Sequence, residues 1–227
     1  YTGMHLKDIL HYRDIDLVKR YATKVSLVKD DKRILLRKIN FPKKDLHILD
    51  LIIPIGHGAY LEDGNLQGYL TTLGIAYTGS STLASAIGQD KVITKQLLQA
   101  NDIAVVPYTW FYDYQFQKSS KEIINKIEKE LKYPLFVKPA TLGSSIGVAK
   151  VSDAKELSTA IKNAIVLDKK ILVEEAINNP KELNISVMGD YEKQEVSAIE
   201  EINVDDEFYT FKEKYVDGLN KVRPLKK

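Results

Sequence analysis

A loop rich in glycine and serine carries the residues best suited to bind phosphate. The loop, residues 141–147, lies between two strand-like stretches and offers backbone N–H groups, the hydroxyls of Ser144 and Ser145 and little steric bulk. A loop of this composition can fold over a polyphosphate. Lys138 lies on the other face of the preceding strand from Val137 and could bring its ammonium to a phosphate. A plain glycine hairpin with a surface lysine is the alternative interpretation.

Three glutamates are candidates for contacts with a nucleoside. Glu174 and Glu175 end an apolar strand, where a carboxylate could accept hydrogen bonds from an adenine amine or a ribose hydroxyl. Glu182 follows some residues later as a further candidate. Acids at a strand end are more often solvated than functional, so the spacing alone leaves both interpretations open.

A histidine and an acidic tripeptide mark a second candidate site. His57 directly follows an apolar strand, at the carboxyl end where open α/β sheets bind their ligands. A structural role is the alternative for a lone histidine. Glu62, Asp63 and Gly64 come next, and these residues also suit an acidic helix start, because acidic side chains favour the N-terminal end of the helix dipole.

An aromatic segment near the end of the sequence has the character of a covering loop. Phe208, Tyr209 and Phe211 precede Lys214 and Tyr215 in a polar, turn-rich stretch without helical or strand periodicity. Exposed aromatic residues on loops often close over a site. A loop held in place by its aromatic side chains fits the same pattern.

The composition excludes several other chemistries. The 33 Lys and Arg residues nearly balance the 31 Asp and Glu residues, so binding to nucleic acid through phosphate neutralisation is not expected. The chain has no cysteine, which excludes disulfides, thiolate zinc sites and cysteine nucleophiles. It also has no zinc-hydrolase or serine-hydrolase motif. The most apolar segment, 48–55, is far shorter than the about 20 residues of a membrane-spanning helix, and we interpret it as a buried strand.

The first half of the chain has the pattern of an α/β unit. Alternation of apolar and polar residues over 25–36 predicts a hairpin. The continuous apolar run 48–55 predicts a strand covered by helices on both faces. A helix is expected over 66–73, ending at Gly74, and residues 75–77 can return as another strand.

The second half should be α+β with antiparallel pairing. We expect a helix over 90–100 with Ile93, Leu97 and Leu98 on one face, followed by a strand over 103–106. A capping box from Ser119 to Glu122 predicts the start of the next helix. The remaining expected elements are strands at 135–139, 147–151, 171–175 and 196–202, with a helix from Ser152 and a turn at Gly189 and Asp190.

Taken together, these segments resemble the D-alanine–D-alanine ligases of the ATP-grasp superfamily. The resemblance covers nearly the whole chain and rests on six groups of residues in the family's order. They are His57-Gly58 with Glu62-Asp63-Gly64 and Gln67-Gly68; Tyr77-Thr78-Gly79-Ser80; Leu83-Ala84-Ser85-Ala86 with Asp90-Lys91; Phe136-Val137-Lys138-Pro139 with Leu142-Gly143-Ser144-Ser145 and Gly147; Val173-Glu174-Glu175; and Phe208-Tyr209 with Glu213-Lys214-Tyr215.

The resemblance implies a fold and an activity. The fold is a partial N-terminal α/β substrate domain over 1–86, followed by an ATP-grasp fold with its central subdomain over 87–174 and the start of its C-terminal subdomain over 175–227. The activity is the ATP-dependent joining of two D-alanines through an acyl phosphate, with Mg²⁺ or Mn²⁺, for peptidoglycan precursor synthesis in the cytoplasm. A homodimer is implied, with neither nucleic acid nor membrane as a partner.

The family's pattern also implies residue roles. On the nucleotide side, the residues are Lys91 and Lys138 at the phosphates, Ser144 and Ser145 in the loop that covers them, Glu174 at the adenine, Glu182 at the ribose, and Lys214 at the γ-phosphate. Glu175 is a further nucleotide-binding residue. On the substrate side, Ser144 and Tyr215 would help to orient the first D-alanine, and His57 would lie near its carboxylate.

Some of the family's functional residues would lie outside this sequence. Its glycine-rich segment and glutamate would precede Tyr1, and its arginine and its Asp, Glu and Asn magnesium ligands would follow Lys227. We therefore expect no metal ligand in this chain and no ligation by a polypeptide of this length. One alternative is a ligase that takes D-serine or D-lactate as its second substrate. Tyr215 favours D-alanine over D-lactate but does not exclude D-serine. The other alternative is a noncatalytic ATP-binding fragment.

Overall fold

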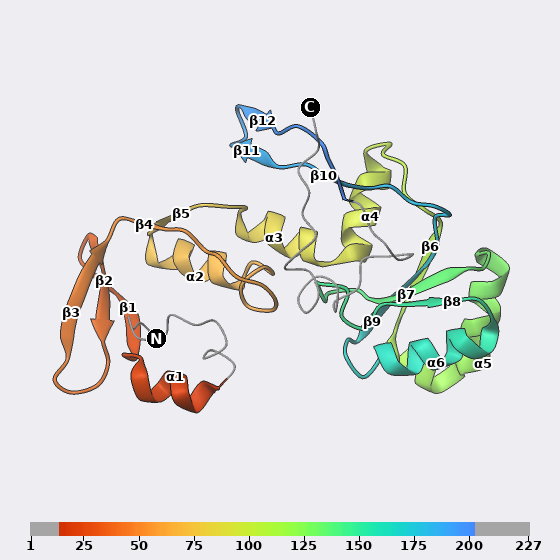
Figure 1. The fold of residues 1–227 in the computed structure, drawn as a ribbon, viewed down its shortest axis with the longest axis horizontal. Helices are drawn as coiled ribbons and strands as arrows, with labels where there is room; N and C mark the ends of the chain where they lie inside the picture. Colours follow the sequence, from red (N-terminus) through yellow and green to blue (C-terminus); the bar gives the residue numbers. More distant parts are fainter. Residues whose placement is uncertain (1–13, 203–227) are drawn as a thin grey trace. The chain divides into compact units, whose positions relative to one another are not determined.

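The computed structural model describes residues 14–202, and the chain divides into two compact units, residues 1–86 and 87–227. Each unit has its own helices and sheets (Figure 1). Between residues 14 and 202, no helix has the length and apolar character needed to cross a membrane.

The first unit begins with a helix and an antiparallel sheet. Helix α1 (Ile15–Tyr21) starts after Asp14, whose carboxylate accepts two backbone N–H bonds. Strands β1 (Val25–Asp30), β2 (Arg33–Lys38) and β3 (Lys44–Leu49) form a sheet in that order. The predicted hairpin is confirmed, because β1 and β2 pair antiparallel around a two-residue turn.

A short parallel pair and a helix complete this unit, and a second helix runs across its boundary at residue 86. Strand β4 (Leu51–Ile52) pairs with β5 (Ala76–Tyr77), and helices α2 (Asn65–Leu73) and α3 (Thr82–Gln89) flank β5 in the sequence. The predicted end of α2 is confirmed, since Gly74 has a φ of 77° and donates its N–H to the last turn. A positive φ of this size favours glycine.

The prediction of one continuous strand over 48–55 is wrong. The segment changes sheets, because β3 pairs antiparallel with β2 whereas β4 pairs parallel with β5. Leu49 and Ile52 pack against the buried Leu70, but the Ile53 side chain is 63% exposed. Ile48, Leu51 and Ile55 are exposed as well, so the segment is not covered on both faces.

The second unit is built on a four-stranded antiparallel sheet in the order β6-β9-β7-β8. Its strands are β6 (Tyr108–Tyr112), β7 (Leu135–Pro139), β8 (Ala149–Val151) and β9 (Lys170–Glu175). Its helices are α4 (Lys91–Ala100), α5 (Asp113–Glu130) and α6 (Ala154–Ala164).

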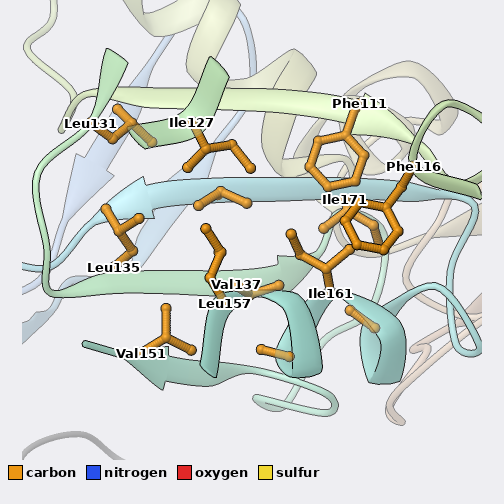
Figure 2. Close-up of a cluster of buried hydrophobic side chains, with 13 residues drawn as sticks. Phe111, Phe116, Ile127, Leu131, Leu135, Val137, Val151, Leu157, Ile161 and Ile171 are labelled. Atoms are coloured by element: carbon orange, nitrogen blue, oxygen red, sulfur yellow. The ribbon is translucent and has the colours of Figure 1, made fainter. Parts of the chain in front are cut away.

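Alternate residues of the central strand β9 face two different layers. Ile171 and Val173 belong to the core that α5 and α6 form with the sheet, in which Ile161 is fully buried (Figure 2). Burying a side chain of this size contributes about 1.5–3 kcal/mol. Leu172 points the other way and packs with Val92 of α4. The sheet therefore has α5 and α6 on one face and α4 on the other.

The predicted strand over 103–106 is displaced in the structure. Residues 103–106 have no regular secondary structure, and β6 begins at Tyr108, opposite Glu174 of β9. Asp102 has a φ of 57°, so the chain turns after α4 before it can pair. Pairing with β9, which local periodicity does not report, decides where the strand starts.

The helix predicted to begin at Ser119 begins earlier. Helix α5 starts at Asp113, and the Tyr112 N–H donates to the Gln115 side chain at 2.7 Å. Ser119 instead lies at a kink inside α5, with φ −144° and ψ 59°. The prediction thus found a real interruption but missed the helical turns before it.

The buried face of α4 also differs from the one suggested by periodicity. The Ile93 and Leu97 side chains are 39% and 49% exposed, whereas Val92 is fully buried. Val92 packs against Ala140 and Leu172. Contact with the sheet near the N-terminal end of α4, rather than the apolar stripe of the helix, selects the buried residue.

Two small antiparallel pairs follow β9. Strands β10 (Glu182–Asn184) and β13 (Glu200–Ile202) form one pair, and β11 (Val187–Gly189) and β12 (Gln194–Val196) form the other. The predicted turn at Gly189 and Asp190 is confirmed, with the Asp190 carboxylate accepting N–H bonds from the two residues that follow Tyr191.

Candidate functional site

A cavity of about 400 Å³ in the second unit brings together most of the residues predicted for the nucleotide. It is lined by residues of α4, β7, β8, β9, the loop before β8 and the start of β10. The predicted residues that line it are Lys91, Lys138, Ser144, Ser145, Glu174, Glu175 and Glu182. These residues come from five separate segments of the chain and include both phosphate-binding and nucleoside-binding candidates.

The glycine- and serine-rich loop has a tightly turned backbone. Ser144 and Ser145 have φ angles of 54° and 58°, and Gly147 has a φ of 71°. Asp168 holds the entry to the loop by accepting the Thr141 N–H at 2.7 Å and its hydroxyl at 2.9 Å. Turns that bring successive N–H groups together can form concave anion sites.

Lys91 projects from the first residue of α4 toward this loop. Its Nζ donates to the carbonyls of Pro139, at 3.2 Å, and Leu142. Burial, and next the charge of Lys138, lower the pKa of the Lys91 ammonium below its ordinary value. The carboxylates of Asp168, Glu174 and Asp90 act in the opposite direction, so burial is the main cause of the lowered pKa.

Asp90 positions α4 and thereby both lysines that this helix carries. Its Oδ1 accepts the N–H groups of Val92 and Ile93, and its Oδ2 lies 2.6 Å from Lys170 Nζ. One carboxylate thus caps α4 and ties the helix to β9. The Lys170 side chain also lies over the Trp110 ring, 5.3 Å from its centroid.

Replacing Asp90 with alanine should lower the free energy of unfolding by about 2 kcal/mol. The change removes a helix cap, worth ~0.5–2 kcal/mol, and leaves the largely buried Lys170 without its carboxylate. Urea denaturation would measure the loss. Asp153→Ala is the matched control, because Asp153 caps α6 from an exposed position. A loss at Asp90 no larger than at Asp153 would contradict the contribution of the ion pair.

Glu174 is a buried carboxylate beside two lysines. Its Oε1 lies 2.5 Å from Lys138 Nζ, and its Oε2 lies 2.8 Å from Lys95 Nζ. Burial by itself would raise the pKa of Glu174, but the two lysines, Lys138 first, outweigh it and hold the pKa below its usual range. The carboxylate is therefore ionised at neutral pH.

Lys95 is the functional candidate that our sequence reasoning missed. It lies four residues after Lys91, so the two lysines share one side of α4. This spacing of four residues was the feature of the sequence that could have identified Lys95. Lys150 also lines the cavity, from β8, and was not predicted.

The other two glutamates lie at the cavity with different surroundings. Glu175 accepts the Lys132 N–H at 2.8 Å through Oε1, which ties the end of β9 to the segment before β7. Glu182 is half-buried at the first residue of β10. These observations do not test the nucleoside contacts predicted for Glu175 and Glu182, which stay predictions.

His57 lies in the first unit, on the loop that leads to α2. Its side chain is 70% exposed, with Nδ1 3.6 Å from Glu62 Oε1. Glu62 accepts the Gly58 N–H, and Asp63 accepts the Tyr60 N–H at 2.8 Å. The acidic tripeptide therefore organises its own loop before α2, in accord with the structural alternative, and the predicted substrate role of His57 stays a prediction.

The remaining candidates are not placed. Lys214 and Tyr215, with the aromatic segment that begins at Phe208, lie outside the described residues. Over residues 14–202, the structure has no group of three or more His, Cys, Asp or Glu side chains that could hold a metal ion.

Sequence comparisons connect the chain to one family. Residues 97–224 match the family described as D-ala D-ala ligase C-terminus. A D-alanine–D-alanine ligase of Thermosipho melanesiensis is 39% identical over 215 residues, covering 95% of this chain and 57% of the relative. That of Natranaerobius thermophilus is 39% identical over 198 residues, covering 87% of this chain and 53% of the relative. The chain thus spans little more than half the length of these curated relatives.

Solved structures agree with the sequence comparisons. The D-Ala:D-Ser ligase VanG of Enterococcus faecalis aligns with a TM-score of 0.73 and 30% identity, covering 95% of this chain and 60% of that chain. The D-alanine–D-alanine ligase of Helicobacter pylori aligns with a TM-score of 0.70 and 28% identity, covering 84% of this chain and 57% of that chain. These similarities confirm the predicted ATP-grasp fold class.

Proposed function

The chain belongs to the D-alanine–D-alanine ligase family, and from this premise we propose that the protein joins two D-alanines to D-alanyl-D-alanine with cleavage of ATP to ADP and phosphate. The observation that carries the proposal is the cavity shared by three lysines (Lys91, Lys138 and Lys150), the serine loop and three glutamates. Lysines and loop N–H groups suit a polyphosphate, and carboxylates suit the amine and hydroxyls of a nucleoside.

The nucleotide would occupy this cavity with its phosphates at the loop. Lys91 and Lys138 would neutralise the phosphates, and Ser144 and Ser145 would cover them. Glu174 would face the adenine and Glu182 the ribose, with Glu175 beside them as a further nucleotide-binding residue. Lys214 would reach the γ-phosphate.

The reaction would begin with transfer of the γ-phosphoryl group to the carboxylate of the first D-alanine. Phosphoryl transfer depends on positioning and charge neutralisation, which the lysines provide. The amino group of the second D-alanine would then attack the acyl phosphate, releasing phosphate and forming the peptide bond. Ser144 and Tyr215 would orient the first D-alanine, with His57 near its carboxylate.

Magnesium would lower the charge repulsion between the phosphates and the incoming carboxylate. Residues 14–202 contain no cluster of acidic or histidine side chains suited to hold it, so the ion has no assigned ligand in this part of the chain. From the family, we further propose that the enzyme is a cytoplasmic homodimer and that its product enters peptidoglycan precursor synthesis.

A D-serine-adding ligase is the second candidate, because one similar solved structure bears that name. Phosphate release from ATP and magnesium, measured with D-alanine alone and with D-serine or D-lactate added, separates the two. We expect release with D-alanine alone and D-alanyl-D-alanine as the product. An intact mass on the same sample identifies the chain that was assayed.

The outcomes of this assay are distinct. Faster release with D-serine, and a mixed dipeptide as product, would favour the second candidate. ATP binding without turnover by a 25.7 kDa chain would indicate a noncatalytic ATP-binding fragment. Lack of D-amino-acid-dependent release by a longer chain would contradict the proposed reaction.

A further inference from the structure

Glu174 has two lysine partners that differ in their access to the cavity. Lys138 lines the cavity and lies over the Phe136 ring, 5.1 Å from its centroid. Lys95 is not among the cavity-lining residues, and its Nζ lies 5.2 Å from the centroid of the Tyr108 ring. Lys138 is thus exposed to a ligand in the cavity, whereas Lys95 contacts Glu174 from the protein side.

The contact with Lys95 is the main interaction that compensates for the burial of one charged oxygen of Glu174. The Oε2 atom is buried and has no hydrogen bond of good geometry among residues 14–202. Lys95 Nζ, at 2.8 Å, supplies an ion pair there, and the Lys95 side chain is only 15% exposed. A buried carboxylate that loses such a partner keeps an uncompensated charge.

The proposed phosphate contact and the observed ion pair compete for the same ammonium. Lys138 Nζ lies 2.5 Å from Glu174 Oε1, so binding a phosphate requires Lys138 to weaken or share that contact. The strength of the ion pair between Glu174 and Lys138 depends on Lys95, the other positive charge beside the Glu174 carboxylate.

We propose that Lys95 is a positioning residue that neutralises Glu174 from the protein side and thereby leaves Lys138 available to the phosphates of ATP. The inference rests on the proposed function, since it concerns the same nucleotide. In this arrangement Lys95 and Glu174 form a neutral pair, and Lys138 joins Lys91 and Lys150 among the lysines that line the cavity. Lys95 would raise ATP affinity without touching ATP.

Removing Lys95 should weaken ATP binding only while Glu174 is charged. We expect Lys95→Met to weaken binding by about tenfold, because Glu174 then holds Lys138 alone. In a Glu174→Gln background, where no carboxylate competes, we expect the same Lys95→Met change to alter ATP affinity by less than about threefold. Calorimetric titration of the purified protein with ATP and magnesium would measure all four affinities.

Lys170→Met is the matched control for a purely structural effect. Lys170 is 13% exposed, lies 2.6 Å from Asp90 Oδ2 and lies over an aromatic ring, so it has the burial and contacts of Lys95. Its loss should lower the melting temperature about as much as Lys95→Met. Because Lys170 does not contact Glu174, we expect its effect on ATP affinity to be equal in the two backgrounds.

Two results would overturn the inference. An equal cost of Lys95→Met in the wild-type and Glu174→Gln backgrounds would show that Lys95 does not act through Glu174. If Lys95→Met alone does not fold, a tenfold difference between Glu174→Gln and the double variant would overturn it as well. Failure of the wild type to bind ATP would instead overturn the proposed function, and this inference with it.

Discussion

Replacing Lys138 with alanine should weaken ATP binding by about a hundredfold and change D-alanine binding by less than about threefold. The Lys138 ammonium lines the cavity beside Lys91 and Glu174, where a phosphate would gain a charge-assisted hydrogen bond. Such bonds contribute ~1.5–3 kcal/mol each, and the substitution also leaves Glu174 with one lysine to balance its charge. The nucleotide therefore loses attraction and meets a less compensated carboxylate.

Calorimetric titrations with ATP and magnesium, and separately with D-alanine, would measure both affinities for Lys138→Ala. Lys162→Ala is the control, because Lys162 is an exposed residue in the last turn of α6, outside the cavity. It should leave both affinities unchanged. Equal losses for ATP and D-alanine in Lys138→Ala would exclude a phosphate role for this lysine.

Replacing Gly147 with alanine should lower the free energy of unfolding by roughly 2–5 kcal/mol. Gly147 has a φ of 71°, and an added Cβ would lie 2.6 Å from Leu167 Cδ1 and 2.8 Å from Pro139 Cγ. The left-handed conformation costs ~1–2 kcal/mol for a residue with a side chain, and forced overpacking costs ~1–3 kcal/mol more. The strain falls on the loop that carries Ser144 and Ser145, so ATP affinity should fall as well.

Gly88→Ala is the control for this loop prediction. Gly88 lies in helix α3, has no positive φ, and has open space where a Cβ would be placed. Alanine in a helix interior is favoured over glycine by about 0.5–1 kcal/mol, so this variant should be equally or more stable. Urea denaturation of both variants would measure the difference. A Gly147→Ala protein as stable as the wild type would contradict the strained geometry of the loop.

Local features of the fold were predicted well from the sequence where one physical property of a residue type decides its position. Gly74 ends α2 because the left-handed conformation there favours glycine. Val137 is buried and Lys138 lies at the cavity because successive side chains of a strand face opposite ways. These inferences need only the backbone geometry of one element.

Predictions that depended on the neighbours of an element were less successful. Ile93 and Leu97 share a stripe on α4, yet both are substantially exposed, and Val92 packs against the sheet. Periodicity identifies residues that share a face, but contact with another element decides which face is buried. The same limit explains why the apolar segment 48–55 is not one buried strand.

The residue types and their order define the chemistry that is available: ammonium groups, a turned loop with two hydroxyls, and carboxylates at a strand end. The contact of Lys95 and Lys138 with the two oxygens of one carboxylate, Glu174, could not be predicted from residue order and became visible in the folded chain. These residues come from α4, β7 and β9, which meet because the sheet pairs β7 with β9 and α4 packs on it. Residue types and the local periodicity of apolar residues can be read from the sequence, whereas ion pairs between distant segments depend on how the helices and strands pack.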